Sequence, residues 1–254
     1  MRLHPASKRR LAARMLCGSL VACTLFCGGL EAALGAAAQE AAPKTAFRKV
    51  LFLGNSITLH GPAPAIGWLG NWGMAASAAD KDFVHLVTRA LTESTGTAPE
   101  VMVRNIATFE RQYDTCNVKE QWKEAFDFGA DLVIVAIGEN VPKLDSEEAE
   151  ARFEKSVGQL LRDLKANGRP AIVVRSCFWP NRAKDEALKR ACRDADGTFV
   201  DVGALAKDES NYARSEREFS HRGVAAHPGD RGMRAIADAI LTGINNRAQK
   251  ETRR

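Results

Sequence analysis

Short apolar runs alternate with longer amphipathic segments over most of the chain. Five of the runs are rich in Val, Ile and Leu and have the length of β-strands. They are residues 49–53, 101–105, 131–137, 171–175 and 198–202. Several contain a continuous apolar stretch, which is the pattern of strands covered on both faces. These runs are therefore predicted to form the strands of a buried sheet.

Four segments between and after these runs have the apolar spacing of amphipathic helices. They are residues 80–95, 146–166, 183–193 and 230–247. In 146–166, for example, Phe153, Val157 and Leu160 recur at helical spacing. Ser146 stands at the start of that segment, followed by two glutamates, which is typical of a helix N-terminus.

This alternation of strands and helices predicts one α/β domain over residues 47–248. The expected architecture is a three-layer α/β/α sandwich with a five-stranded parallel sheet. In such sheets ligands bind beyond the carboxyl ends of the strands, so candidate chemistry is sought there. Residues 39–46 are interpreted as a linker and residues 249–254 as a polar tail.

Residues 1–38 have the three parts of a secretory signal peptide. Residues 1–14 are basic, residues 15–30 are apolar, and small residues lead up to a cleavage site near Ala38. We therefore expect a secreted or periplasmic protein. An uncleaved anchor helix is one alternative. A lipoprotein is another, because Leu20-Val21-Ala22-Cys23 resembles a lipobox; apart from an anchor, membrane association is expected only if Cys23 is lipidated.

The composition is that of a soluble globular protein. Of 254 residues, 45% are hydrophobic and 26% charged, which excludes a disordered chain, a collagen-like repeat and a multi-span membrane protein. The formal charge is +5, but residues 1–38 alone carry five basic side chains and one acidic one. The remainder is nearly neutral and has no basic cluster, so nucleic acid is not expected as a partner.

Three of the six cysteines, Cys116, Cys177 and Cys192, lie outside the signal segment. An odd number allows at most one disulfide and leaves one thiol free. Their spacing matches no zinc-binding motif, so neither a metal site nor a catalytic thiol is expected.

Three polar side chains lie where the chain leaves the predicted sheet or enters the last helix. Ser56 follows the first strand, where a tight turn could expose its hydroxyl as a nucleophile. Asn140 follows the third strand and could donate its amide hydrogen to an oxyanion. His227 precedes the last helix and could act as a general base. Taken singly, each also fits a structural role as a cap, turn or surface residue.

Taken together, these residues resemble the SGNH (GDSL-like) hydrolase family. The first block of that family reads G-D-S-x-T or G-N-S-x-T, the third G-x-N-D and the last D-x-x-H-P. The corresponding segments here are GNSIT at 54–58, GEN at 138–140 and VAAHP at 224–228. The resemblance covers residues 48–245 and implies a flavodoxin-like sandwich that hydrolyses ester bonds without a metal or organic cofactor. It also implies Ser56 as nucleophile, His227 as base, and Asn140 with the backbone of Ser56 as the oxyanion hole.

The sequence departs from the family pattern in two places. The second block, residues 105–110, lacks the glycine whose N–H completes the oxyanion hole, and Phe109 and Glu110 are the candidates to replace it. The aspartate expected three residues before the histidine is Val224. A backbone carbonyl, or an acid such as Glu216 or Glu218, could orient the imidazole instead; the protein could also act as a Ser-His dyad, or have lost catalysis.

A loop rich in Gly, Pro and Trp, residues 59–76, follows the nucleophile. Trp68 and Trp72 could form a platform for a sugar or acyl group, or could close the core over the end of the sheet. His60, four residues after Ser56, is expected in or near the pocket.

The expected function is that of an exported serine esterase that removes acyl groups, acetyl above all, from small carbohydrate or polysaccharide esters. A lipase or lysophospholipase is the enzymatic alternative. A non-catalytic carbohydrate-binding protein is the other alternative, because Val224 replaces an acid.

Overall fold

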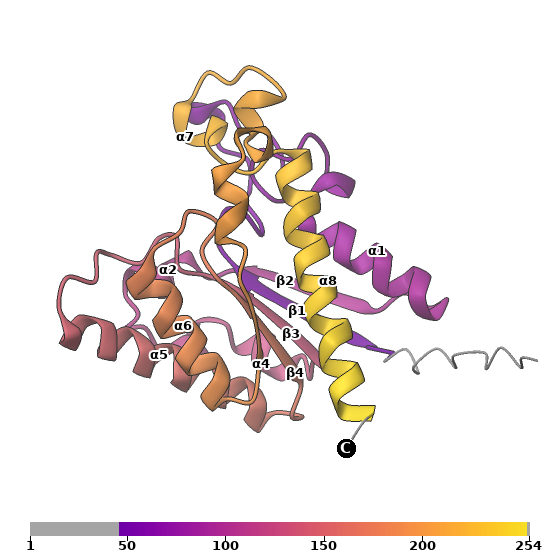
Figure 1. Ribbon diagram of the computed structural model, residues 1–254, viewed down its shortest axis with the longest axis vertical. Coiled ribbons are helices and arrows are strands. Elements are labelled where there is room, and N and C mark those ends of the chain that lie inside the picture. Colours follow the sequence, from indigo (N-terminus) through magenta and orange to yellow (C-terminus); the bar gives the residue numbers. More distant parts are fainter. Residues whose placement is uncertain (1–45, 253–254) are drawn as a thin grey trace, which may run out of the picture. The chain divides into compact units, whose positions relative to one another are not determined.

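The computed structural model describes residues 46–252 (Figure 1). Its sheet has five strands in the order β2-β1-β3-β4-β5, and every neighbouring pair is parallel. The strands are β1 (Lys49–Gly54), β2 (Glu100–Asn105), β3 (Leu132–Ala136), β4 (Ala171–Arg175) and β5 (Thr198–Val200). This is the strand order of flavodoxin-like folds. The predicted five-stranded parallel sheet is therefore confirmed.

Eight α-helices and five short 3₁₀ segments complete the described part of the chain. The helices are α1 (Phe83–Thr95), α2 (Ala107–Arg111), α3 (Val118–Gln121), α4 (Lys123–Asp127), α5 (Glu147–Ala166), α6 (Arg182–Asp194), α7 (Arg222–Ala225) and α8 (Asp230–Thr252). The 3₁₀ segments are Pro64–Ile66, Ala79–Lys81, Gly203–Lys207, Glu209–Asn211 and Ala213–Ser215.

The two faces of the sheet are covered by different helices, as Figure 1 shows. Along β1, Leu51 and Leu53 pack into a cluster with side chains of α5 and α6. Val50 and Phe52 point to the opposite face, into a cluster with side chains of α1 and α8. Alternate residues of one strand thus enter two separate cores, which explains why residues 50–53 are all apolar.

The four long helices form where the apolar spacing predicts them, with differences at their ends. Ser146 caps α5 by accepting a hydrogen bond from the Ala149 N–H at 3.2 Å. The last helix continues to Thr252, so residues 249–252 of the predicted tail are helical. The short helices α2, α3, α4 and α7 were not predicted, because four or five residues are too few to show a helical period.

The predicted signal peptide, its cleavage site near Ala38 and the lipobox at Cys23 lie outside the described residues. Within residues 46–252, no helix is both long enough and apolar enough to cross a bilayer. The three cysteines of this part are unbridged, and Cys177 and Cys192 are buried. Burial raises the pKa of the Cys192 thiol to about 11, so it stays protonated and unreactive near neutral pH.

The strand order changes direction between β1 and β3, both of which pair with neighbours on either side. At such a point the loops leaving adjacent strands diverge and open a crevice above the sheet. The predicted site residues Ser56 and Asn140 follow these two strands.

Candidate active site

Ser56 lies on a tight turn directly after β1. The Asn55 carbonyl accepts hydrogen bonds from the N–H groups of Thr58 (3.0 Å) and Leu59 (2.9 Å), and the Asn55 side chain accepts one from Ile57 (3.1 Å). A β-carbon at Gly54 would collide with the Thr58 side chain, so this turn requires glycine before Asn55. The turn leaves the Ser56 side chain partly exposed between two buried neighbours.

His227 meets Ser56 from the other end of the sequence. Its Nε2 lies 2.8 Å from Ser56 Oγ, and its Nδ1 lies 2.7 Å from the Gly223 carbonyl oxygen. A carbonyl can only accept a hydrogen bond, so Nδ1 carries the proton and Nε2 is left to accept from the serine hydroxyl. The imidazole is therefore held in the tautomer that a general base requires. The Trp179 ring packs edge-on against it, with centroids 5.4 Å apart.

Burial lowers the pKa of His227 below its ordinary value of 6.5. The neighbouring His60 and His221 lower it further, while the Gly223 carbonyl and the charge of Glu139 oppose the shift. A lowered histidine pKa means that the ring is neutral at neutral pH, so Nε2 is free to take a proton there.

Neither of the predicted acids contacts His227. The Glu216 carboxylate accepts hydrogen bonds from the N–H groups of Asp230 and Arg231, both at 2.8 Å, and so caps α8. Glu218 is exposed and has no hydrogen bond to the imidazole. Of the groups that the sequence offers to orient the imidazole, the structure shows a backbone carbonyl, that of Gly223. Val224 is 1% exposed and packs among apolar side chains that include Trp68 and Met74.

Asn140 is held by a carboxylate that the sequence did not single out for this role. Its Nδ2 donates to Glu110 Oε2 at 2.7 Å, and its backbone N–H donates to Glu110 Oε1 at 3.3 Å. On its other side, Arg111 donates to Asn140 Oδ1 at 3.3 Å. An amide NH₂ has two hydrogens and Glu110 takes one, so the second remains for a ligand.

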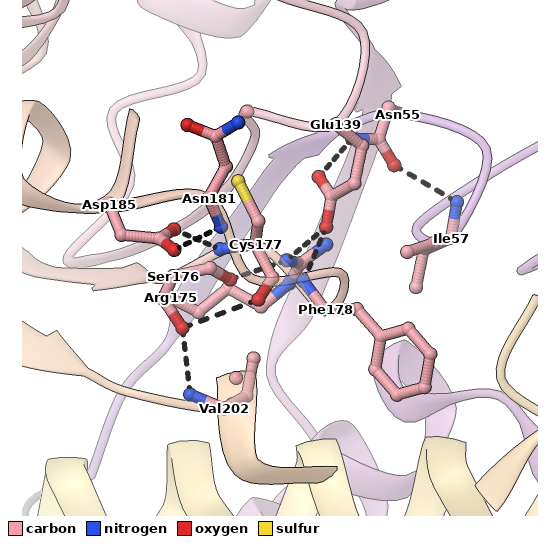
Figure 2. Close-up of polar contacts among 12 residues, drawn as sticks. Asn55, Ile57, Glu139, Arg175, Ser176, Cys177, Phe178, Asn181, Asp185 and Val202 are labelled. Atoms are coloured by element: carbon pink, nitrogen blue, oxygen red, sulfur yellow. Dashed lines mark hydrogen bonds and ion pairs between the residues drawn. The ribbon is translucent and has the colours of Figure 1, made fainter. Parts of the chain in front are cut away.

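A second buried carboxylate, Glu139, connects the nucleophile turn to β4 (Figure 2). It accepts from Asn55 Nδ2 (2.6 Å), from the Phe178 N–H (2.9 Å) and from Arg175 Nη1 (2.6 Å). Arg175 is fully buried, so its guanidinium and the Glu139 carboxylate form an ion pair out of contact with water. Asn55 also donates to Glu110 at 3.1 Å and thereby links the two carboxylates.

The two carboxylates differ in their electrostatics. Burial raises the pKa of Glu110, the charge of Glu139 raises it further, and the hydrogen bonds from Asn140, Asn55 and Gly138 oppose the rise. Burial alone would also raise the pKa of Glu139, but the Arg175 guanidinium together with the hydrogen bonds from Phe178 and Asn55 outweighs it, and the pKa is lowered. Glu139 is therefore the carboxylate held ionised by an ion pair.

Ser56, Asn140 and His227 open into one pocket of about 570 Å³. The other lining residues are His60, Ile66, Met74, Asn105, Ala107, Thr108, Arg111, His221, Gly223 and Val224. The structure thus brings the predicted nucleophile, base, amide donor and His60 together. Arg111 contributes the one formal positive charge of this lining, which contains no carboxylate.

Other predicted site residues lie away from this pocket. Trp68 and Trp72 do not line it; they pack edge-on with centroids 5.6 Å apart, and their indole N–H groups donate to the carbonyls of His60 and Ala76. They stabilise the loop of residues 59–76, which is the second of the two roles that the sequence allows, closure of the core over the end of the sheet. Phe109, a candidate backbone donor, is buried outside the pocket lining.

In the second block, the residue that faces the pocket with an unused N–H is Thr108. Ala107 also lines the pocket, but its N–H donates to Asn105 Oδ1 at 2.9 Å. Within residues 46–252, neither the Thr108 N–H nor the Ser56 N–H donates to another group. The N–H of Glu110, the other predicted donor, is already bonded to the Ile106 carbonyl at 3.4 Å, and Glu110 contributes its carboxylate instead. The sequence offered no signal for this, because a lone glutamate in a short segment is ordinarily exposed.

Comparison with known proteins yields matches in structure alone. Neither a family model nor a curated protein sequence matches the chain. A family two carbohydrate esterase from Cellvibrio japonicus is 16% identical with a TM-score of 0.50, covering 80% of this chain and 62% of its own. A family two carbohydrate esterase from Clostridium thermocellum, solved with cellohexaose, is 15% identical with a TM-score of 0.52, covering 82% and 66%.

A third similar structure, from Bacteroides uniformis, is provisionally described as a GDSL-like lipase. It is 13% identical with a TM-score of 0.50, and the match covers 78% of this chain and 96% of its own. The chain thus spans less than two thirds of the two carbohydrate esterases but nearly all of this third protein. The fold is that of SGNH hydrolases, which confirms the fold that the sequence motifs imply.

Proposed function

We propose that this protein is a serine esterase in which Ser56 and His227 act as a catalytic dyad. The observation that carries the proposal is the 2.8 Å contact between Ser56 Oγ and His227 Nε2, at the wall of an open pocket, with Nδ1 tied to a carbonyl. The fold is shared with carbohydrate esterases and supports ester chemistry.

In the first half of the reaction, Ser56 Oγ attacks the carbonyl carbon of the ester while His227 Nε2 takes the hydroxyl proton. The tetrahedral intermediate collapses, the bond to the alcohol oxygen breaks, and Nε2 returns the proton to that oxygen. In the second half, water attacks the acyl-serine and gives a proton to Nε2, which passes it back to Ser56 as the carboxylic acid leaves. Protons balance over the two halves, so the chemistry needs no cofactor.

The negative oxygen of the intermediate requires donors that are in place beforehand. Three are available beside Ser56: its own N–H, the free hydrogen of the Asn140 amide, and the Thr108 N–H. We assign to the Thr108 N–H the role that a glycine N–H has in the family pattern. Any residue except proline supplies this donor, so the missing glycine is compatible with activity.

A carbonyl in place of the aspartate changes the energetics of the base. The Gly223 carbonyl fixes the tautomer but carries no full charge, so it stabilises the imidazolium of the transition state less than a carboxylate would. We therefore expect a slower enzyme than one with a complete triad, with the same order of steps.

The pocket favours an O-acetylated carbohydrate as substrate. Eight of its 13 lining residues are polar, and the larger apolar side chains are Ile66, Met74 and Val224, the last 1% exposed. A long acyl chain would need a longer apolar surface than these side chains offer. A short acyl group on a hydroxyl-rich alcohol fits better, and export would place the protein where such polymers occur.

One assay, the release of acid from esters of different chain length, distinguishes this proposal from two alternatives. A lipase-type esterase would prefer long acyl chains, whereas a carbohydrate-binding protein would bind oligosaccharides without releasing acid. The replacement of the family's aspartate by Val224 is the observation that favours the second. The intact tautomer and the short Ser56–His227 contact favour catalysis.

The test is acid release from acetylated oligosaccharides and from p-nitrophenyl esters of increasing chain length. We expect the highest kcat/KM on acetyl esters and a loss of at least about a thousandfold in Ser56→Ala. Ser210→Ala, a serine remote in the sequence whose hydroxyl contacts Asp208, is the matched control and should retain activity. Acid release that is unchanged in Ser56→Ala would overturn the proposal.

A further inference from the structure

We propose that Glu110 is a positioning residue of the oxyanion hole: its buried carboxylate fixes the Asn140 amide so that one N–H points at the developing oxyanion. This inference rests on the proposed esterase function. It assigns a role to a residue that is absent from the pocket lining and makes no hydrogen bond with Ser56 or His227.

The contacts of Glu110 are concentrated on one loop. Its two oxygens accept four hydrogen bonds, three of them from the segment after β3: from the Gly138 N–H (2.6 Å), the Asn140 N–H (3.3 Å) and Asn140 Nδ2 (2.7 Å). The fourth comes from Asn55 Nδ2 at 3.1 Å. Glu110 is 0% exposed, so water does not compete for these bonds.

The polarity of its neighbours gives the Asn140 amide one preferred orientation. Nδ2 faces the carboxylate of Glu110, and Oδ1 faces the guanidinium of Arg111. A flipped amide would set its oxygen against the carboxylate and its NH₂ against the cation. Both contacts would be repulsive, so the observed orientation is enforced from two sides.

Glu110 also joins the amide to the nucleophile. Asn55 donates to Glu110 and precedes Ser56 on the turn after β1. The carboxylate thereby ties the loop that holds the oxyanion donor to the turn that holds the attacking oxygen. Catalysis depends on sub-ångström placement of these groups relative to each other, which is what such a link provides.

Glu110→Gln tests the proposal, because the glutamine nitrogen can occupy only one of the two positions that the carboxylate oxygens hold. Three N–H groups converge on Oε1, so the glutamine oxygen must occupy that position and its NH₂ the position of Oε2. There it opposes Asn140 Nδ2, which must either lose its hydrogen bond or flip. Either change removes the oriented donor.

We expect Glu110→Gln to lower kcat on p-nitrophenyl acetate about tenfold to a hundredfold and to change KM by less than about threefold, since an oxyanion donor acts in the transition state. The decisive variant is the double mutant. If Glu110 acts through Asn140, Glu110→Gln should cost nothing further in an Asn140→Ala background. An equal loss in both backgrounds would overturn the proposal and leave Glu110 with a purely structural role.

Asp185→Asn is the matched control. Asp185 also accepts hydrogen bonds from two backbone N–H groups, those of Cys177 (2.7 Å) and Asn181 (2.8 Å) (Figure 2), but is not among the residues that line the pocket. The Asp185→Asn variant should be less stable than wild type but should not show the selective fall in kcat. A comparable fall in kcat would show that kcat falls whenever a carboxylate that accepts backbone hydrogen bonds is removed, which contradicts a specific role for Glu110.

The Asn140 side-chain amide can also be followed by ¹⁵N NMR without any turnover, its signal identified by its loss in Asn140→Ala. We expect slow hydrogen exchange of the proton bonded to Glu110, and fast exchange in Glu110→Gln. This measurement tests the esterase proposal and the positioning role of Glu110 separately. An inactive protein with a protected amide would overturn the esterase but retain the positioning contact, whereas an active protein with an unprotected amide would overturn the positioning role alone.

Discussion

Restoring the missing aspartate by Val224→Asp should damage the protein rather than improve the enzyme. The family pattern places an acid here to accept from the histidine Nδ1. In this structure that proton is already taken by the Gly223 carbonyl at 2.7 Å. Val224 is 1% exposed and belongs to a cluster with Trp68, Met74, Ala75 and Ala213. The new carboxyl would enter an apolar site whose hydrogen-bond needs are already met.

The cost has two parts. Removing a fully buried valine side chain loses about 1.5–3 kcal/mol of burial free energy. Placing a carboxyl in the same site costs about 1–3 kcal/mol more, whether it stays ionised or takes up a proton. The sum, about 2.5–6 kcal/mol, is a large share of the roughly 5–15 kcal/mol that stabilises a typical domain. At about 2–4 °C per kcal/mol, we expect the melting temperature to fall by roughly 5–24 °C.

The assay pairs thermal unfolding with kcat on an acetyl ester, and Val224→Thr is the near-isosteric control. We expect Val224→Asp to melt well below wild type with no gain in kcat, and Val224→Thr to lose less stability at unchanged kcat. A rise in kcat of tenfold or more, with a melting temperature close to that of wild type, would refute this reasoning. It would mean that the site has room for a carboxylate, and that this carboxylate reaches Nδ1 of His227 in place of the Gly223 carbonyl.

Three further predictions concern the charged groups. Because the pKa of His227 is lowered, kcat/KM should be retained as pH falls to 6.5 and lost only below it, as the base becomes protonated; a midpoint above 6.5 in the pH–rate profile would contradict this. Glu216→Ala should cost about 1 kcal/mol in urea unfolding by uncapping α8, and leave kcat within about twofold; a large loss of kcat would restore Glu216 as a catalytic acid. Arg175→Met leaves Glu139 buried without its counter-ion and should cost about 3–5 kcal/mol, measured by urea unfolding. The pKa of Glu139 is lowered in the folded state, so its ion pair stabilises the fold at pH values above the unfolded-state pKa, and this stabilisation is lost as the pH falls. Arg175→Met should therefore make the free energy of unfolding less sensitive to acid. An unchanged pH dependence of stability would contradict the assigned ion pair.

The sheet could be predicted because its strands are buried on both faces. Residues 132–136, for example, are all buried, and such runs are recognisable without knowledge of the contacts. The nucleophile, base and amide donor could also be predicted, since the carboxyl ends of parallel strands bring together residues distant in sequence. Ser56 and His227 are 171 positions apart and lie in hydrogen-bond contact.

What the sequence could not provide are the partners of those residues. The acceptor of the His227 proton is a backbone carbonyl, which every residue possesses and no motif encodes. Glu110 was considered only for its N–H, because the burial of its carboxylate arises from three separate segments meeting. Trp68 and Trp72 were open to two interpretations, since an aromatic residue on a loop packs inward or faces a ligand with the same sequence signature.

The most direct measurement is intact-mass analysis after exposure to a fluorophosphonate, which forms a stable bond only with an activated serine. The account predicts a single adduct on the wild-type protein, located at Ser56, no adduct on folded Ser56→Ala, and slow labelling of His227→Ala. A folded wild-type protein that stays unlabelled, or an adduct that persists in Ser56→Ala, would contradict the claim that this hydroxyl and this imidazole form a working dyad.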